Sequence, residues 1–105
     1  MDELLLWECK DGVLTVQLPK DIDHHVAKIV RGRIDEMLER LHPGSLLLDL
    51  TRTQFMDSSG LGLILGRARV TQERGIDYQL INPNRATMKI LEMAGVDRML
   101  SISRI

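Results

Sequence analysis

Apolar and polar residues alternate in the first part of the chain with the period of two that is typical of β-strands. From Leu14 to Leu18, apolar side chains occupy every second position and polar ones lie between them, as expected for a strand with one buried face. The Asp-Gly dipeptide before this run favours a tight hairpin turn, because glycine tolerates the positive φ that such turns require. The segment ELLLWECKDGVLTVQL is therefore predicted to form two strands joined by a turn at Lys10–Gly12, and Pro19 ends the second strand.

Two longer segments have the apolar repeat of α-helices. The first has apolar residues at helical spacing over positions 26–41, a candidate N-cap at Asp23, and the sequence HPG at 42–44 that stops it. The second runs from about Ser58 to Arg74 and ends at a glycine. Both are long enough to pack along a sheet.

Shorter apolar segments predict further strands and a third helix, so that strands and helices alternate along the chain. Leu46–Leu50 is almost continuously apolar, which indicates a strand that is covered on both sides or lies at the centre of a sheet. Asp77–Ile81 and the segment RMLSIS are predicted strands. NPNRATMKILEMAG is expected to form a third helix, with a cap, a proline in its first turn and a glycine past its end.

The resulting order, ββαβαβαβ, predicts the α/β class. We expect a single domain over residues 1–105, with a mixed four- to five-stranded sheet and helices packed mainly on one face. The βαβ crossovers should be right-handed. A chain of 105 residues has room for one hydrophobic core.

Composition narrows the functional classes. A net charge of −1 and a pI of about 6.3 give no electrostatic basis for binding nucleic acid. The single cysteine, Cys9, excludes a disulfide framework and zinc clusters with several thiols, and it suits a reducing cytosol. The N-terminal apolar run is too short for a signal peptide or a membrane span. We therefore expect a cytoplasmic protein with no nucleic-acid or membrane partner.

The residues best suited to a functional site lie in the stretch FMDSSGLGLILGRA, where an acid, two hydroxyls and two glycines stand between a predicted strand and a predicted helix. In the simplest interpretation, Asp57 or Ser58 caps the helix, which contributes roughly 1 kcal/mol. Gly60 and Gly62 then let the chain turn closely against the sheet. A dinucleotide fingerprint is disfavoured, because Gly66 follows the second glycine by four residues and the motif requires three.

A serine hydrolase would use Ser58 or Ser59 as nucleophile, with His24 or His25 as base. Met56 occupies the position where the nucleophile-elbow motif has glycine. No enzymatic activity, cofactor or metal is therefore expected.

The helix after this stretch has an unusual outer face. At about 100° per residue, its sheet-facing side is predicted to be Leu61, Ile64, Leu65 and Ala68. The opposite side is predicted to be Ser59, Gly62, Leu63, Gly66 and Val70. A small, apolar strip on an outer face is typical of a surface that docks another protein.

Together these residues resemble a known family. LDLTRTQFMDSSGLGLILGRARV, followed by INPNRATMKILEMAGVDRML, is similar to the STAS domain of anti-sigma factor antagonists, sporulation type. DIDHHVAK matches the segment that opens the family's first helix. The resemblance covers nearly the whole chain. The chain departs from the family at Lys20 and Asp21, where glycine and glutamate are common, and it ends at Ile105 without the family's usual further C-terminal helix.

The resemblance implies a phosphorylation-controlled partner switch. The unphosphorylated antagonist would bind a dimeric, ATP- or ADP-bound anti-sigma factor serine kinase and free the sigma factor. That kinase would phosphorylate Ser58, and a PP2C-type phosphatase would restore it. Asp23, Asp57 and the segment Ser59–Gly62 would lie on the kinase-facing surface, together with Leu63 of the outer strip. The alternative is a STAS scaffold subunit of another signalling or lipid-transport complex.

Overall fold

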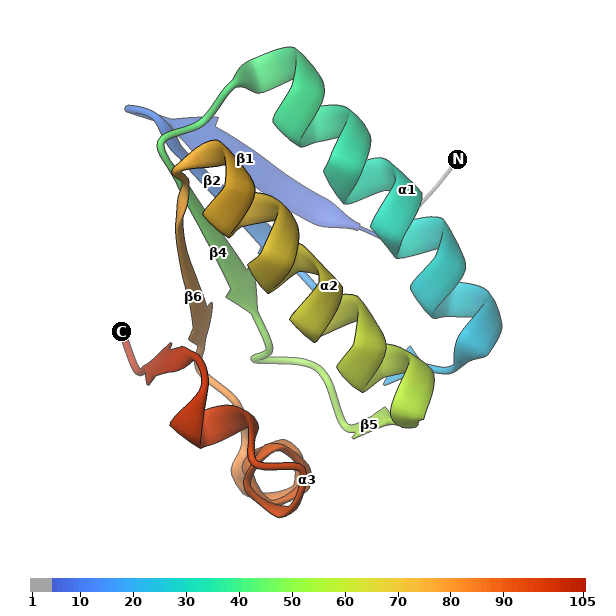
Figure 1. Ribbon diagram of the computed structural model, residues 1–105. Coiled ribbons are helices and arrows are strands. Elements are labelled where there is room, and N and C mark those ends of the chain that lie inside the picture. Colours follow the sequence, from blue (N-terminus) through green and yellow to red (C-terminus); the bar gives the residue numbers. More distant parts are fainter. Residues whose placement is uncertain (1–4) are drawn as a thin grey trace.

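The computed structural model describes residues 5–105, which form a mixed sheet with two long helices against one face (Figure 1). The sheet order is β1-β2-β4-β6-β7, and β3 and β5 form a separate two-stranded pair. In chain order the elements are β1 (Leu6–Lys10), β2 (Val13–Gln17), β3 (Asp21–Ile22), α1 (His24–Leu41), β4 (Ser45–Asp49), β5 (Phe55–Met56), α2 (Ser58–Arg74), β6 (Asp77–Ile81), α3 (Arg85–Met93), a 3-10 turn (Val96–Arg98) and β7 (Ser101–Ser103).

The predicted hairpin is confirmed for its described part, while Glu3 and Leu4 of the predicted first strand lie outside the described residues. β1 and β2 pair antiparallel, and Lys10 faces Val13, so only two residues form the loop. Asp11 and Gly12 both have positive φ, 53° and 79°. This is the backbone that an Asp-Gly turn between right-twisted strands requires.

One face of the sheet holds the core. Alternate side chains of the central strands are fully buried and pack in one cluster with α1 and α2, namely Leu14 and Val16 of β2, Leu46 and Leu48 of β4, and Leu80 of β6. The intervening side chains of β2 and β4 are only half-buried. The apolar run at 46–50 is therefore a central strand covered on one side, and the prediction of helices mainly on one face is confirmed.

The third helix lies beyond one end of the sheet rather than over its face (Figure 1). Asn84 is its N-cap and accepts from the backbone N–H of Thr87 at 2.8 Å. The Asn84 amide and the Thr87 hydroxyl both donate to the carbonyl of Thr53, at 2.9 and 2.8 Å. The expectation of a proline in the first turn was wrong, because Pro83 precedes the cap.

The short β3–β5 pair was not predicted, and it decides where the long helices begin. β3 pairs in parallel with β5, Asp21 facing Phe55 and Ile22 facing Met56. One residue after each strand comes the N-cap of a helix, Asp23 for α1 and Asp57 for α2. Pairing the strands therefore places the N-termini of α1 and α2 side by side.

Candidate functional site

The two helix N-termini are held together by a close backbone approach at Gly60. A Cβ atom at this position would lie 2.6 Å from Met56 Cβ and 3.3 Å from Ile22 Cγ2. No larger side chain fits without movement of β5 or β3. Gly60 is buried, so its predicted place on a partner-facing surface was wrong. Its role is to let α2 start against the strand pair.

Carboxylates cap both helices. Asp57 Oδ1 accepts from the backbone N–H groups of Ser59 and Gly60, at 2.8 and 3.2 Å. Asp23 Oδ1 accepts from the N–H of Val26 at 2.9 Å. The choice between Asp57 and Ser58 as the cap of α2 thus falls to Asp57, and Asp23 is confirmed as the cap of α1.

Ser58 is the first residue of α2, and its side chain is exposed. Within residues 5–105 its hydroxyl has no hydrogen-bond partner. Capping by Asp57 leaves this hydroxyl available, because the amides that a serine cap would satisfy are already bonded.

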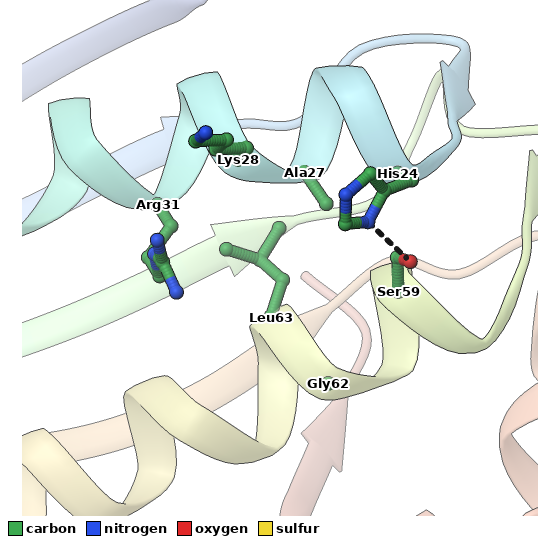
Figure 2. A pocket seen from close by; sticks show the side chains of 7 residues that line it. All are labelled: His24, Ala27, Lys28, Arg31, Ser59, Gly62 and Leu63. Atoms are coloured by element: carbon green, nitrogen blue, oxygen red, sulfur yellow. Dashed lines mark hydrogen bonds between the residues drawn. The ribbon is translucent and has the colours of Figure 1, made fainter.

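Ser59 differs from its neighbour although only one peptide bond separates them. Its side chain is half-buried, and its Oγ lies 3.2 Å from Nδ1 of His24 on α1 (Figure 2). One pairing of the hydrolase interpretation, Ser59 with His24, is therefore brought together.

Two features of the Ser59–His24 pair differ from an activated nucleophile. The amides beside Ser59 that would stabilise an oxyanion are occupied by the Asp57 carboxylate. Among the described residues, His24 has no further hydrogen-bond partner that would orient its ring. The geometry is that of a contact joining two helices.

A groove of about 450 Å³ lies between α1 and α2 beside this contact (Figure 2). Its lining residues are His24, Ala27, Lys28, Arg31, Ser59, Gly62 and Leu63. The α1 side contributes a histidine and two cations, whereas α2 contributes small and apolar groups. The groove therefore combines an apolar floor with a basic wall.

The outer strip predicted for α2 is only partly correct. Gly62 is exposed, but Leu63 is 4% exposed and points from α2 toward α1 (Figure 2). The expectation that Leu63 stands on an outer surface was therefore wrong. The helical spacing predicts one buried side, facing the sheet, whereas α1 lies beside α2 in the same layer and covers a second side of it.

The buried face of α2 includes polar residues, so apolar residues alone do not reveal it. The residues of α2 that are buried recur at helical spacing and are Gly60, Leu63, Ile64, Arg67 and Thr71. Two of these five are polar and one is glycine, so a search for apolar periodicity does not find this face. The spacing of three and four was the signal that could have found it.

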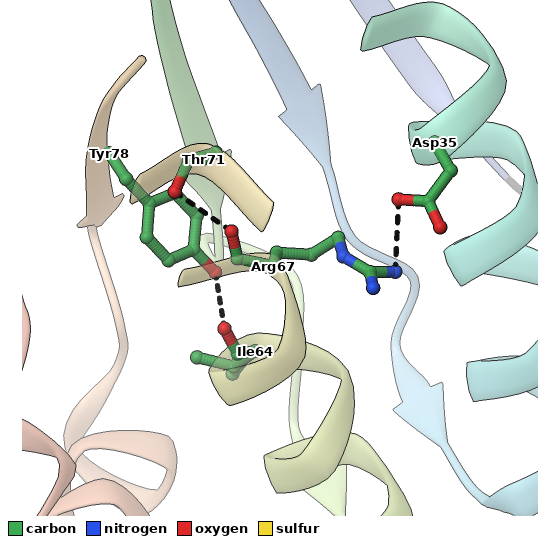
Figure 3. A network of polar contacts seen from close by, with 5 residues as sticks. All are labelled: Asp35, Ile64, Arg67, Thr71 and Tyr78. Carbon is green, nitrogen blue, oxygen red and sulfur yellow. Dashed lines mark hydrogen bonds and ion pairs between the residues drawn. The ribbon is translucent and has the colours of Figure 1, made fainter. Parts of the chain in front are cut away.

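Arg67 crosses from α2 to α1 inside this layer (Figure 3). Its side chain is almost fully buried, and its Nη1 lies 3.2 Å from Asp35 Oδ1. The contact is a close pairing of charges rather than an aligned hydrogen bond. Burial lowers the pKa of Arg67, and the carboxylate of Asp35 opposes that change.

Tyr78 of β6 packs beneath the same part of α2. Its hydroxyl donates to the carbonyl of Ile64 at 2.8 Å, which adds a bond from the sheet to the helix (Figure 3). Burial raises the pKa of Tyr78, and the nearby positive charge of Arg67 opposes this only in part. The middle of α2 is therefore fixed to both β6 and α1.

The described residues contain no group of three or more His, Cys, Asp or Glu side chains arranged to hold a metal ion. None of the helices in the described part of the chain is long and apolar enough to cross a membrane.

Comparisons with known proteins agree with this architecture. Residues 6–104 match the STAS domain. An anti-sigma F factor antagonist of Paenibacillus polymyxa is 37% identical over 91 residues, which cover 87% of this chain and 78% of the relative. An anti-sigma F factor antagonist of Lysinibacillus sphaericus is 29% identical, with 79% of this chain and 71% of the relative covered.

Solved structures have the same fold. The unphosphorylated anti-sigma factor antagonist SpoIIAA superimposes with a TM-score of 0.80 at 25% identity, over 93% of this chain and 86% of that one. The phosphorylated form of SpoIIAA, a Bacillus cell fate determinant, superimposes with a TM-score of 0.73 at 25% identity, over 93% of this chain and 89% of that one. The chain therefore belongs to the STAS domain family, and its relatives include anti-sigma factor antagonists.

Proposed function

We propose that this chain is an anti-sigma factor antagonist whose binding is controlled by phosphorylation of Ser58. The unphosphorylated form binds an anti-sigma factor serine kinase, a dimer with ATP or ADP bound, and the sigma factor is released. The kinase transfers the γ-phosphoryl group of ATP to Ser58 Oγ and leaves ADP. A PP2C-type phosphatase hydrolyses the phosphoserine with water and restores the binding form.

The observation that carries this proposal is the state of the Ser58 side chain. It is exposed, and its hydroxyl has no partner among the described residues. A kinase can therefore approach it without breaking an internal bond. Ser59 is a poorer acceptor, because it is half-buried and its Oγ lies against His24. The relatives' names and the two forms of SpoIIAA support the same interpretation.

The position of Ser58 explains how a large change in charge is compatible with the fold. A phosphoserine carries about −1.5 to −2 charges. At the first position of a helix these charges meet the positive end of the helix dipole, which favours them. The cap itself remains, because Asp57 holds the backbone amides. The modification should therefore alter binding rather than folding.

The binding surface is proposed to surround Ser58. Asp23 and Gly62 are exposed, and Asp57 and Ser59 are half-buried next to them. Gly60 and Leu63 contribute indirectly, since one sets the start of α2 and the other forms the floor of the groove. A phosphate beside Asp57 adds like charge at this surface, and a few kcal/mol of repulsion changes an affinity by orders of magnitude.

The test is to incubate the chain with the anti-sigma factor of the same organism and ATP, and to locate the added phosphate by mass spectrometry. Ser58→Ala should accept no phosphate and stay bound to its partner. Ser59→Ala, the matched control, should be phosphorylated like the wild type. Ser58→Asp should bind the partner poorly. Phosphate on Ser59, or equal affinity of Ser58→Ala and Ser58→Asp in a titration, would contradict the proposal.

A further inference from the structure

The basic wall of the groove is formed by one side of α1. His24, Lys28 and Arg31 stand four and three residues apart, a spacing that places helical side chains on a common face. All three are exposed, and all three line the groove. Figure 2 shows them spaced along α1 beside Leu63.

Lys28 and Arg31, the two cations of this wall, lack the carboxylate partners that other basic residues of the two helices have. Ion pairs to carboxylates are formed by Arg40, Arg67, Arg69 and Arg74. Lys28 and Arg31 form none with the described residues. Arg31 even lies near a like charge, since its proximity contributes to lowering the pKa of Arg67. The groove therefore has an excess of positive charge in the free protein.

The other end of the site has the opposite sign. Asp23 and Asp57, the two N-caps, stand one and two residues before the groove-lining residues His24 and Ser59. A partner that places negative charge along Lys28 and Arg31 and avoids the two aspartates is held in one register. Such complementary patterns set specificity and speed encounter.

A small anion fits this groove less well than a protein segment does. The free amides of a helix N-terminus are what normally hold phosphate, but Asp57 already bonds those of Ser59 and Gly60. The floor is apolar at Ala27 and Leu63. A segment with both carboxylates and apolar side chains matches wall and floor together.

We propose that the groove between α1 and α2 binds an acidic segment of the anti-sigma partner, whose carboxylates face Lys28 and Arg31. This rests on the proposed function and adds the charge of the partner's contacting segment. It also explains how a phosphate on Ser58 would act. Ser58 is the residue before the groove-lining Ser59, so a phosphate there adds negative charge beside the groove and repels the acidic segment.

The experiment measures affinity for the anti-sigma factor of the same organism, in ADP, for the wild type and for charge-reversed variants. Lys28→Glu and Arg31→Glu should each weaken binding roughly tenfold or more. Lys10→Glu is the matched control, because Lys10 is an exposed lysine at the β1–β2 turn, and this turn contacts the chain just after the C-terminus of α1, at the end of that helix away from His24; it should bind like the wild type. Raising the salt concentration should weaken the wild type more than Lys28→Glu.

The outcomes separate this inference from the proposed function. If the wild type is phosphorylated on Ser58 and Lys28→Glu binds as tightly as Lys10→Glu, the acidic segment is ruled out and the switch stands. If the wild type neither binds the factor nor accepts phosphate, both fall. Calorimetry with inorganic phosphate alone adds a further check. Tight binding of phosphate that Lys28→Glu abolishes would identify a small-anion site and overturn the inference. Melting curves of each variant confirm that it folds.

Discussion

The two ends of the α1–α2 pair are built differently. Toward their C-termini the helices are joined by charge pairs, Asp35 with Arg67 at 3.2 Å and Glu39 with Arg74 at 3.0 Å. Toward their N-termini a groove separates them, and the cations on its wall are unpaired among the described residues. At the C-terminal end, the closed end, charged side chains pair with each other across the two helices. At the N-terminal end, the open end, Lys28 and Arg31 are exposed to solvent.

This difference separates stability from binding. At the closed end Arg67 connects α2 to α1, and Tyr78 connects the middle of α2 to β6, so these contacts are part of the fold. At the open end, Ser58 and Lys28 are exposed and contribute little to packing. A partner or a phosphate can therefore change the open end while the closed end keeps the helices in place. The following changes test this comparison, starting with the largest expected effect.

Leu63→Ala should lower the free energy of unfolding by about 2–5 kcal/mol, because a side chain that is 4% exposed leaves a cavity between the helices. Gly62→Ala is the control from the next position of the same helix. A Cβ there meets no atom within 4 Å, so this variant should be at least as stable as the wild type. Chemical denaturation measures both. Equal stability of the two variants would mean that Leu63 is not a core residue.

Asp35→Asn should cost about 1–3 kcal/mol, because it leaves the buried guanidinium of Arg67 without its counter-charge, while Asp35 itself is 44% exposed and partly screened by solvent. Glu39→Gln breaks the second ion pair of the closed end, but both partners of that pair are substantially exposed. Its cost should stay below about 1 kcal/mol. Similar losses for the two variants in thermal unfolding would show that burial does not distinguish the pairs.

Gly60→Ala should destabilise the chain by about 1–3 kcal/mol, because its Cβ would overlap Met56 and force β5 away from α2. Gly66→Ala, where a Cβ has open space, should be neutral or stabilising. If both substitutions stabilise the helix equally, as measured by denaturant midpoints, the close approach at the strand pair is not a constraint.

Alkaline pH should destabilise the fold through Tyr78. Burial raises the pKa of Tyr78 above its ordinary value of 10.0, so the folded state keeps the hydroxyl neutral while the unfolded chain ionises. Stability from this group is complete below pH 10 and falls as the pH rises further, by roughly 1.4 kcal/mol per unit. Tyr78 is the only tyrosine in the chain, so its ultraviolet absorbance reports the titration directly.

For the wild type, tyrosinate should appear only together with unfolding. Tyr78→Phe should lose the hydrogen bond to Ile64 but also this part of the alkaline decline. A tyrosine that titrates near pH 10 in the folded protein would show that the ring is accessible to water.

The sequence was most informative where local rules act alone. The Asp-Gly turn at 11–12, the cap at Asp23 and the bounds of α2 follow from backbone preferences and from the amides that a helix leaves free. The order of the elements and the single covered face of the sheet also came from local patterns. The family resemblance rested on such a stretch, DSSG and its flanks, and the match over residues 6–104 confirms it.

The predictions of burial were wrong where one element packs against another that is distant in sequence. Leu63 was placed outside because only one neighbour of α2 was considered, and Gly60 was assigned to the surface because its contacts come from β3 and β5. Pro83 was placed inside α3 although Asn84 supplies the cap. The roles of Arg67 and Tyr78 depend on partners far away in the chain.

The amino-acid sequence by itself determined the alternation of strands and helices, the capping carboxylates and the serine at the start of α2. These depend on each residue and its near neighbours. Only the tertiary structure decided that two neighbouring serines differ, with Ser58 free and Ser59 held against His24. It also decided that Lys28 and Arg31 face a groove while Arg67 is buried. The physical reason is that burial and charge pairing depend on which helix faces lie together, and the pairing of β3 with β5 sets that arrangement.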